Sequence, residues 1–182
     1  MRSRFTSLFF LSFLFTGCGI NTDSPVYPIS VLINPVQVPA IVSLTPVQIW
    51  EPNNDYRIEF DLRYYITNQE QEFIGYNLYS STTATSAQNT GYGAIIYLPR
   101  GIEPSFDHIG ATPSTLSTDI VTQRLTDFKA SPSPIAFQLC EKYFFRLQAV
   151  LQNGIKSNLS NQAEACAITD INLCPSGSIC NP

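Results

Sequence analysis

The chain has 182 residues, of which 44% are hydrophobic and 13% charged, and its formal net charge is −4. An acidic chain without a Lys/Arg cluster argues against nucleic acid or anionic lipid headgroups as partners. Abundant Tyr, Phe and Pro with few charged residues are typical of a β domain built from short strands and turns.

A basic and then apolar segment opens the chain. Arg2 and Arg4 precede an apolar run over residues 5–15, which is much too short to span a bilayer as a helix. This pattern predicts a signal peptide over residues 1–17. Removal of its two arginines changes the formal charge of the chain from −4 to −6.

The residues at the end of this segment resemble the lipobox of bacterial lipoproteins. Phe15-Thr16-Gly17-Cys18 places a small residue directly before a cysteine at the end of the apolar run. The resemblance implies cleavage before Cys18, diacylglycerol on its sulfur and a palmitate-type acyl chain on its amine. Gly19 in the next position implies delivery to the outer membrane, with the protein lipid-anchored on the cell surface or the periplasmic face. The alternative is an ordinary secretory signal, with Cys18 as a spare thiol.

Residues 18–39 are expected to form the lipidated cysteine and an extended tether. The prolines here are Pro25, Pro28, Pro35 and Pro39. They remove backbone donors and favour extended conformations in the residues before them, which predicts a semi-rigid spacer. The rest of the chain is long enough for one domain over residues 40–170, followed by a cysteine-containing tail over 171–182.

Alternating apolar and polar residues predict the first strands of this domain. Residues 40–50 are typical of an edge strand that is broken by Pro46. Residues 58–66 alternate strictly, and no helical period fits them. The inward set of that strand is Ile58, Phe60, Leu62, Tyr64 and Ile66. Residues 73–79 predict a third strand, with Ile74, Tyr76 and Leu78 inward.

The middle of the chain is less regular. Residues 80–90 are rich in Ser, Thr and Ala and are expected to form a solvated loop. Residues 92–98 predict a strand that Pro99 ends. Residues 120–128 fit either a strand or a few helical turns, and periodicity does not decide between them.

The domain is organised around a hairpin between Cys140 and Cys166. Its first strand has Tyr143, Phe145, Leu147 and Ala149 on one face and Lys142, Phe144, Arg146 and Gln148 on the other. Asn153-Gly154 tolerates positive φ and predicts the turn, after which residues 161–168 return antiparallel.

The run from Tyr143 to Val150, followed by Asn153-Gly154 and Ser157-Asn158-Leu159-Ser160, resembles the last hairpin of a fibronectin type III domain. The resemblance implies an all-β, two-sheet antiparallel immunoglobulin-like sandwich. It also implies a tyrosine corner at Tyr143, with Phe137 at the apolar position six residues earlier.

Four cysteines remain after Cys18, and three pairings of them are possible. Cys140 and Cys166 lie almost symmetrically about the Asn153-Gly154 turn, on the polar face of the hairpin. Opposed residues in an antiparallel pair come within bridging range, so the spacing predicts a Cys140–Cys166 disulfide. Cys174 and Cys180 would then close a small terminal loop.

The residue types with catalytic or metal-binding potential are sparse. His108 is the only histidine, so any Ser-His-Asp or Cys-His mechanism would have to use it. Residues 51–55, or Glu70 and Glu72, offer oxygens to calcium but lack the spacing of a known calcium loop. We therefore expect neither enzyme activity, nor a metal, nor any cofactor or small-molecule substrate.

A binding role remains, because long polar loops flank the rigid strands. The candidate binding residues are Asn153, Lys156 and Asn158 in the hairpin loop and Thr83 and Asn89 in the loop at residues 80–90. The first hypothesis is a lipid-anchored, non-catalytic module that presents these loops to a protein or glycan ligand, as adhesins do. The alternative is a structural or accessory lipoprotein of an outer-membrane or periplasmic assembly.

Overall fold

The structure is a computed structural model that describes residues 36–53, 55–66, 68, 70, 72–84, 94–107 and 120–182. These residues belong to the second of the two units into which the chain divides, Pro35–Pro182. Cys18, Asn89 and His108 lie outside the described residues, and so does most of the predicted tether. Within this described part, we find no helix with the length and apolar character that crossing a bilayer requires.

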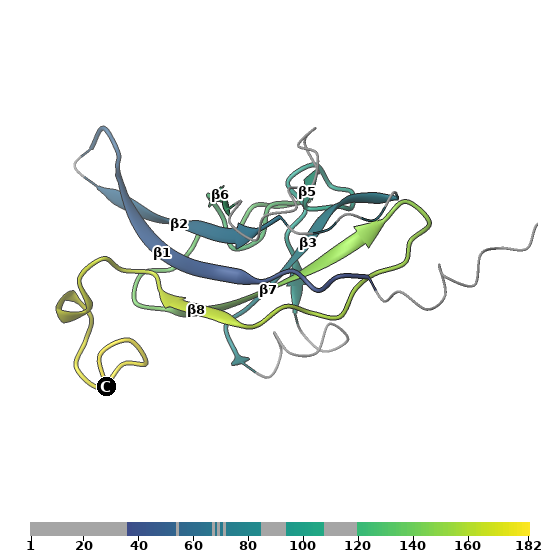
Figure 1. Cartoon of the computed structure of the whole chain (residues 1–182). Coiled ribbons are helices and arrows are strands. Elements are labelled where there is room, and N and C mark those ends of the chain that lie inside the picture. Colours follow the sequence, from purple (N-terminus) through teal and green to yellow (C-terminus); the bar gives the residue numbers. More distant parts are fainter. Residues whose placement is uncertain are drawn as a thin grey trace, which may run out of the picture. The chain divides into compact units, whose positions relative to one another are not determined.

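Two antiparallel sheets face one another (Figure 1). The strands are β1 Ile41–Trp50, β2 Tyr56–Tyr65, β3 Phe73–Ser81, β4 Ile95–Ile96, β5 Phe106–Asp107, β6 Ile120–Leu125, β7 Lys142–Leu151 and β8 Ala163–Cys166. The first sheet has the order β1-β2-β6, and the second has the order β4-β3-β7-β8 with β5 also paired to β3. This arrangement confirms the predicted all-β, two-sheet sandwich.

The core forms where the inward faces of β2 and β7 meet. The inward residues Ile58, Phe60, Leu62, Tyr64, Tyr143, Phe145, Leu147 and Ala149 are all buried. Phe137 joins them, and its ring centroid lies 4.7 Å from that of Phe60 and 5.0 Å from that of Tyr143. Because burial of each large apolar side chain contributes roughly 1.5–3 kcal/mol, this cluster is the main stabilising element.

The tyrosine corner is present. The Tyr143 hydroxyl accepts a hydrogen bond from the backbone N–H of Gln138 at 2.9 Å, five residues upstream. Burial raises the pKa of Tyr143, although this hydrogen bond opposes the shift. The corner fixes the chain before β7 onto the core, as the resemblance to fibronectin type III domains implies.

Side chains close the gap between the sheets where β1 runs beside β8 (Figure 1). The Asn161 amide accepts from the Ile41 backbone N–H at 2.8 Å and donates to the Ile41 carbonyl at 3.0 Å. Near the other end of β1, the Thr169 hydroxyl donates to Gln48 at 3.2 Å. Neither pair is part of a strand ladder, so side chains take the place of sheet hydrogen bonds along this edge.

A bulge in β3 makes the predicted core wrong at one position. The pairing of β3 with β7 shifts between Phe73 and Gly75, so the extra residue changes which side chain faces inward. Phe73 is buried, whereas Ile74, the predicted core residue, is only half-buried. Gly75 has φ +154°, and a Cβ there would lie 2.1 Å from the Phe106 carbonyl oxygen. The close approach of β5 therefore requires glycine at this position.

Segments in the middle of the chain also differ from the sequence prediction. β3 extends through Ser80 and Ser81, which were expected in a solvated loop but are buried. The Ser80 hydroxyl lies within hydrogen-bonding distance of the carbonyls of Ile95 and Phe128, which explains how a polar side chain is tolerated there. Within the described residues, the strand expected over 92–98 is reduced to β4. The segment that fitted either a strand or helical turns, residues 120–128, forms the strand β6 over its first six residues.

The disulfide pairing predicted from the hairpin is wrong. Cys140 is bonded to Cys174 and Cys166 to Cys180, with Cα–Cα distances of 5.5 and 5.9 Å. In the β7–β8 ladder Cys166 lies opposite Lys142, two residues from the expected partner. Cys140 stands before the strand with φ +62°, a left-handed conformation that ends the alternation on which the prediction depended.

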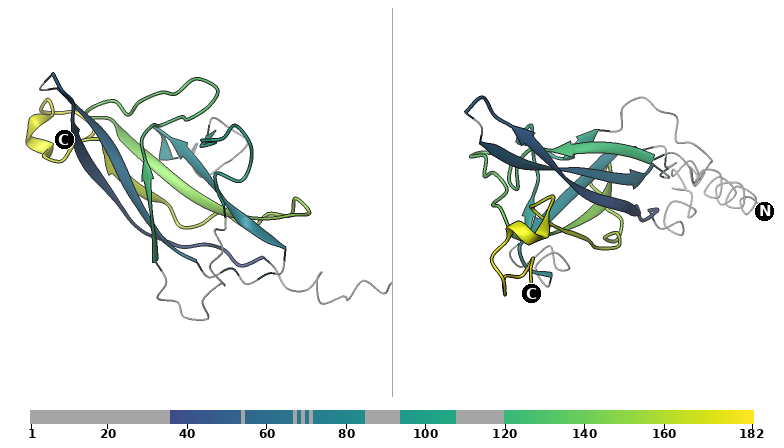
Figure 2. Two further views of the ribbon diagram at one scale, coloured as in Figure 1. Left: turned by 90° about the horizontal axis from the view of Figure 1, so that it is seen from above. Right: turned by 90° about the vertical axis from the view of Figure 1, so that its left-hand side faces the viewer.

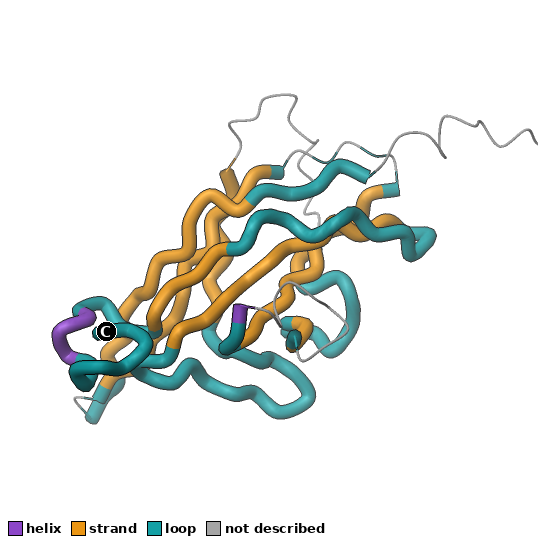
Figure 3. Tube along the Cα trace, turned by 90° about the horizontal axis from the view of Figure 1, so that it is seen from below, coloured by secondary structure: helices purple, strands orange, loops and turns teal. Residues whose placement is uncertain are grey.

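These crossed disulfides fold residues 167–182 into a small structure at one end of the sandwich, which we call the cap (Figure 2). It contains the 3₁₀ helix η1, Ile171–Leu173. Ile168, Cys174 and Cys180 form its own buried cluster. β7 starts at this cap end and finishes at the Asn153-Gly154 turn, which marks the opposite hairpin end (Figures 1 and 3).

Candidate functional site

The turn at the hairpin end is short and defined. The Gly154 N–H donates to the Leu151 carbonyl and the Leu151 N–H to the Ile155 carbonyl, both at 2.9 Å. Gly154 has φ +81°, and the Asn153 side chain accepts from the Ile155 N–H at 3.0 Å. The candidate residues Asn153, Lys156 and Asn158 are all exposed.

The chain beyond this turn is fixed to β7 by two serines. The Ser157 hydroxyl accepts from the Ala149 N–H at 2.9 Å, and the Ser157 N–H donates to the Ala149 carbonyl at 3.0 Å. Ser160 repeats the same pair of contacts on Leu147, both at 2.8 Å. Both serines are buried. Residues 152–160 are therefore not a freely replaceable loop, because the hydroxyls satisfy backbone groups of β7 that would otherwise be unpaired.

Lys156 also contacts the chain between β4 and β5. Its ammonium lies 2.7 Å from the Glu103 carboxylate. Partial burial raises the pKa of Glu103, but the contact with Lys156 and the nearby Asn77 amide outweigh this effect, so that its pKa is lowered overall. In the same segment Arg100 is ion-paired with Asp107. The hairpin end thus carries two matched ion pairs, Lys156–Glu103 and Arg100–Asp107.

Thr83 and the candidate residues of the hairpin turn lie at opposite ends of the sandwich. β3 and β7 pair antiparallel, with Ser81 opposite Phe144 and Phe73 opposite Leu151. Thr83 follows β3 at the cap end, where its N–H donates to the Ser81 hydroxyl at 3.0 Å. The hairpin turn is seven residues away along β7, or roughly 23 Å. A single small ligand cannot contact both Thr83 and the hairpin turn.

Two of the carboxylates considered for calcium, those of Glu51 and Glu70, are bonded to protein groups. Glu51 is ion-paired with Arg57 at 2.8 Å, and Glu70 accepts hydrogen bonds from Asn68 and from the Gln37 N–H. Among the residues the structure describes, no group of three or more His, Cys, Asp or Glu side chains is arranged to hold a metal ion. Asp107, next to His108 in sequence, is held by Arg100.

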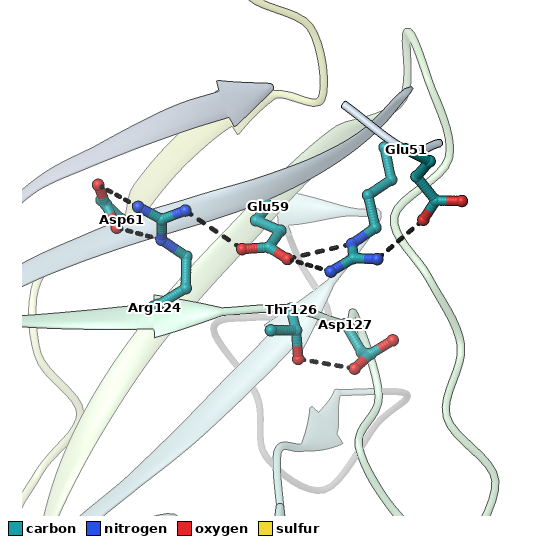
Figure 4. Close-up of polar contacts among 7 residues, drawn as sticks. Glu51, Glu59, Asp61, Arg124, Thr126 and Asp127 are labelled. Atoms are coloured by element: carbon teal, nitrogen blue, oxygen red, sulfur yellow. Dashed lines mark hydrogen bonds and ion pairs between the residues drawn. The ribbon is translucent and has the colours of Figure 1, made fainter. Parts of the chain in front are cut away.

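An ionic network covers the outer face of the first sheet (Figure 4). Glu59 is almost fully buried there, with its carboxylate 2.9 Å from Arg57 and 3.2 Å from Arg124. Arg124 also pairs with Asp61 at 2.6 Å, and its hydrogen bonds to Asp61 and Glu59 raise its pKa. These charges satisfy one another across β2 and β6, so the network has a structural explanation.

The cap end differs in character, because large apolar side chains are exposed there. Ile171, Leu173 and Ile179 of the cap are 52%, 65% and 61% exposed. Trp50, at the end of β1 beside the β1–β2 turn, is 66% exposed and stacks edge-on with Tyr56. Figure 2 places the cap and this turn at the same end of the sandwich.

The LIC11073-like family matches residues 17–182. The chain belongs to this family. Curated proteins give no significant match to this family member. Among solved structures, it is similar to an Fn3-like protein from Clostridium thermocellum, with 14% identity, a TM-score of 0.29, and coverage of 70% of this chain and 92% of that one.

Two enzymes are also among the similar structures of this LIC11073-like chain. One is a β-1,2-glucanase from Parabacteroides distasonis, with 14% identity, a TM-score of 0.32, and coverage of 75% of this chain and 14% of that one. The other is the pectate lyase Pel3 from Pectobacterium carotovorum, with 12% identity, a TM-score of 0.28, and coverage of 78% and 29%.

Sequence reasoning about this family member missed the apolar residues of the cap. A signal was present, since Ile171, Leu173 and Ile179 lie close to the paired cysteines of a short segment whose only charged side chain after Ile168 is Asp170. Small disulfide-closed segments have little core in which to bury such residues. Aliphatic side chains in them therefore stay exposed.

Proposed function

We propose that the protein is a lipid-anchored, non-catalytic interaction module of the cell envelope, which presents a rigid sandwich to a protein or glycan ligand. The observation that carries the proposal is the fixed hairpin turn. Gln152–Lys156 is exposed at the tip of a hairpin whose returning chain is bonded to β7 by Ser157 and Ser160. Binding residues are often placed on loops that a rigid scaffold holds.

The anchoring part of the proposal depends on Cys18. The family match begins at residue 17, next to the proposed cleavage site, and the described domain begins at Val36. Cys18→Ala is expected to release the protein from the membrane fraction into the soluble fraction. Retention of Cys18→Ala in the detergent phase with the membranes would contradict the anchor.

The non-catalytic part is supported by the use of charged side chains. Glu59, Glu103 and Asp107 are each paired with a cationic side chain of the same domain. Carboxylates paired in this way are typical of structural ion pairs and are poorly suited to proton transfer. Cleavage of a polysaccharide by the purified protein would overturn this part.

The binding part is tested at the hairpin turn. Asn153→Ala with Lys156→Ala is expected to abolish capture of the protein by its ligand in a panel of purified glycans and envelope proteins. Thr83→Ala tests the other candidate loop separately, because Thr83 lies at the other end of the sandwich. Equal capture by all variants would move the site away from both loops.

A second candidate function is favoured by the cap. Exposed aliphatic side chains on a rigid end are typical of docking to another protein, and they suit an accessory lipoprotein of an envelope assembly. Copurification of the protein with an outer-membrane complex would support this role over capture of a soluble ligand.

A further inference from the structure

The cap presents its apolar side chains on a backbone that has little freedom. Two disulfides join it to the β7–β8 hairpin. The Asp170 side chain accepts from the Asn172 N–H at 3.0 Å at the start of η1, and the Asn181 amide donates to the Cys174 carbonyl at 3.0 Å. Apolar side chains held this way lose little conformational entropy when they are covered, which favours binding.

The cap lies far from where the chain enters the domain. Gln37 donates its N–H to Glu70, which lies just before β3 begins at the hairpin end. β1 then runs for ten residues, from Ile41 to Trp50 at the cap end, which is roughly 30 Å. A tether attached at the hairpin end leaves the cap as the end farther from its attachment.

The charges at the cap end are mostly negative. Arg57 and Lys142 are ion-paired with Glu51, Glu59 and Glu164. The remaining charged side chains at this end are Asp55, Asp127, Glu141 and Asp170 against Lys129. An acidic rim opposes contact with a second, equally acidic copy and with anionic lipid headgroups. It favours a surface with basic residues.

We propose that the cap docks into an apolar groove, rimmed by Lys or Arg, on another envelope protein. Ile171, Leu173 and Ile179 supply the apolar contacts, and Asp170 and Glu141 supply the charge complementarity. This inference rests on the accessory role given above as the second candidate function.

Site-specific photocrosslinking of the full, lipidated chain in its native cells tests the proposal. A benzophenone amino acid replaces Leu173, and in a separate variant it replaces Ile102. Ile102 is the matched control, because it is an aliphatic residue with 64% exposure in the segment that Lys156 contacts through Glu103. The position of Leu173 is expected to give an adduct with a protein of one defined mass, and the position of Ile102 is expected to give none of that mass.

Two further variants test the chemistry of the contact. Ile171→Ser with Ile179→Ser is expected to abolish the adduct, and Asp170→Lys with Glu141→Lys is expected to reduce it by about fivefold or more. All four positions are at or near the surface, and unchanged disulfide mapping checks that each variant is folded. An adduct that survives the serine variant, or that is unaffected by both lysines, would overturn the proposal.

Other possible partners of the cap would give different results in these experiments. A crosslinked dimer of the chain, or adducts with lipid alone, would overturn the proposal. So would a shift in emission of Trp50, the only tryptophan, on mixing with vesicles of phosphatidylethanolamine and phosphatidylglycerol. If the cap fails these tests while Asn153→Ala with Lys156→Ala abolishes ligand capture, the interaction module stands without this docking surface. If both fail, the proposed function falls as well.

Discussion

The two ends of the sandwich are stabilised by different means. At the hairpin end, the hydroxyls of Ser157 and Ser160 and the amide of Asn161 bond to backbone groups of neighbouring strands. At the cap end, two disulfides hold a segment whose own buried cluster consists of Ile168 and cysteines. The hairpin end can use hydrogen bonds because the returning chain runs beside β7 there. The cap has no strand partner for most of its length and depends on covalent links.

The same difference separates the surfaces that the ends present. At the hairpin end Lys156 is paired with Glu103, and the exposed residues are polar ones together with Ile155 and, in the neighbouring segment, Ile102. The cap end exposes Trp50, Ile171, Leu173 and Ile179. We infer that the hairpin end suits a polar ligand and that the cap end suits a protein surface.

The largest expected effect comes from the core that both ends share. Leu147 is fully buried on β7 between them. Leu147→Ala is expected to lower the free energy of unfolding by about 2–5 kcal/mol, because it removes apolar contacts and leaves a cavity. Urea denaturation of the two proteins measures this difference in the free energy of unfolding. A loss below about 1 kcal/mol would show that β7 is not the centre of the core.

The next effect distinguishes the two disulfides. Cys140–Cys174 spans 34 residues and Cys166–Cys180 spans 14. On the chain-entropy argument their removal costs about 4 and 3 kcal/mol, respectively. Paired Cys→Ser variants in denaturation experiments measure the difference. If non-reducing peptide mapping of the native chain showed Cys140–Cys166, the cap described here would be wrong.

Much of the sandwich could be predicted, because residues 58–65 and 143–149 alternate regularly enough to show which side chains face the core. Tyr143 with Phe137 then predicted the corner. The disulfide pairing could not be predicted from spacing. It depended on the left-handed conformation of Cys140, which takes that residue out of the strand pattern.

The remaining errors have similar local causes. The bulge at Gly75 exchanges Phe73 for Ile74 in the core, and a single extra residue leaves no mark on the hydrophobic pattern. Ser157 and Ser160 have the composition of a loop, yet they are buried because their hydroxyls accept from strand N–H groups. From the sequence, Thr83 and Asn153 are proposed together as binding residues, because the sequence does not show that they lie at opposite ends of the sandwich.

Alkaline pH tests the core that lies between the two ends. Burial raises the pKa of Tyr64 to about 12 from its usual value near 10. The folded state therefore keeps this proton above pH 10 while the unfolded state loses it, so stability is complete below pH 10 and falls between pH 10 and 12. The loss from Tyr64 approaches about 2–3 kcal/mol at pH 12. Tyr64→Phe is expected to reduce the slope of stability against pH in this window, and an unchanged slope would contradict it.

A smaller effect is expected at the hairpin end. Ser157→Ala removes the acceptor for the Ala149 N–H and is expected to cost about 1–3 kcal/mol, the usual penalty for a buried unpaired group. Asn158→Ala is the control, because Asn158 is exposed beside it. Equal stability of the two variants would show that the serine hydroxyl is not needed.

Hydrogen–deuterium exchange with and without a reductant tests the central contrast most directly. Reduction of both disulfides is expected to remove protection from the backbone amides of residues 167–182. The amides of Leu147, Ala149, Ser157 and Ser160 are expected to stay protected, because hydrogen bonds and not disulfides hold the hairpin end. Full protection of the cap after reduction, or loss of protection at both ends together, would contradict this account.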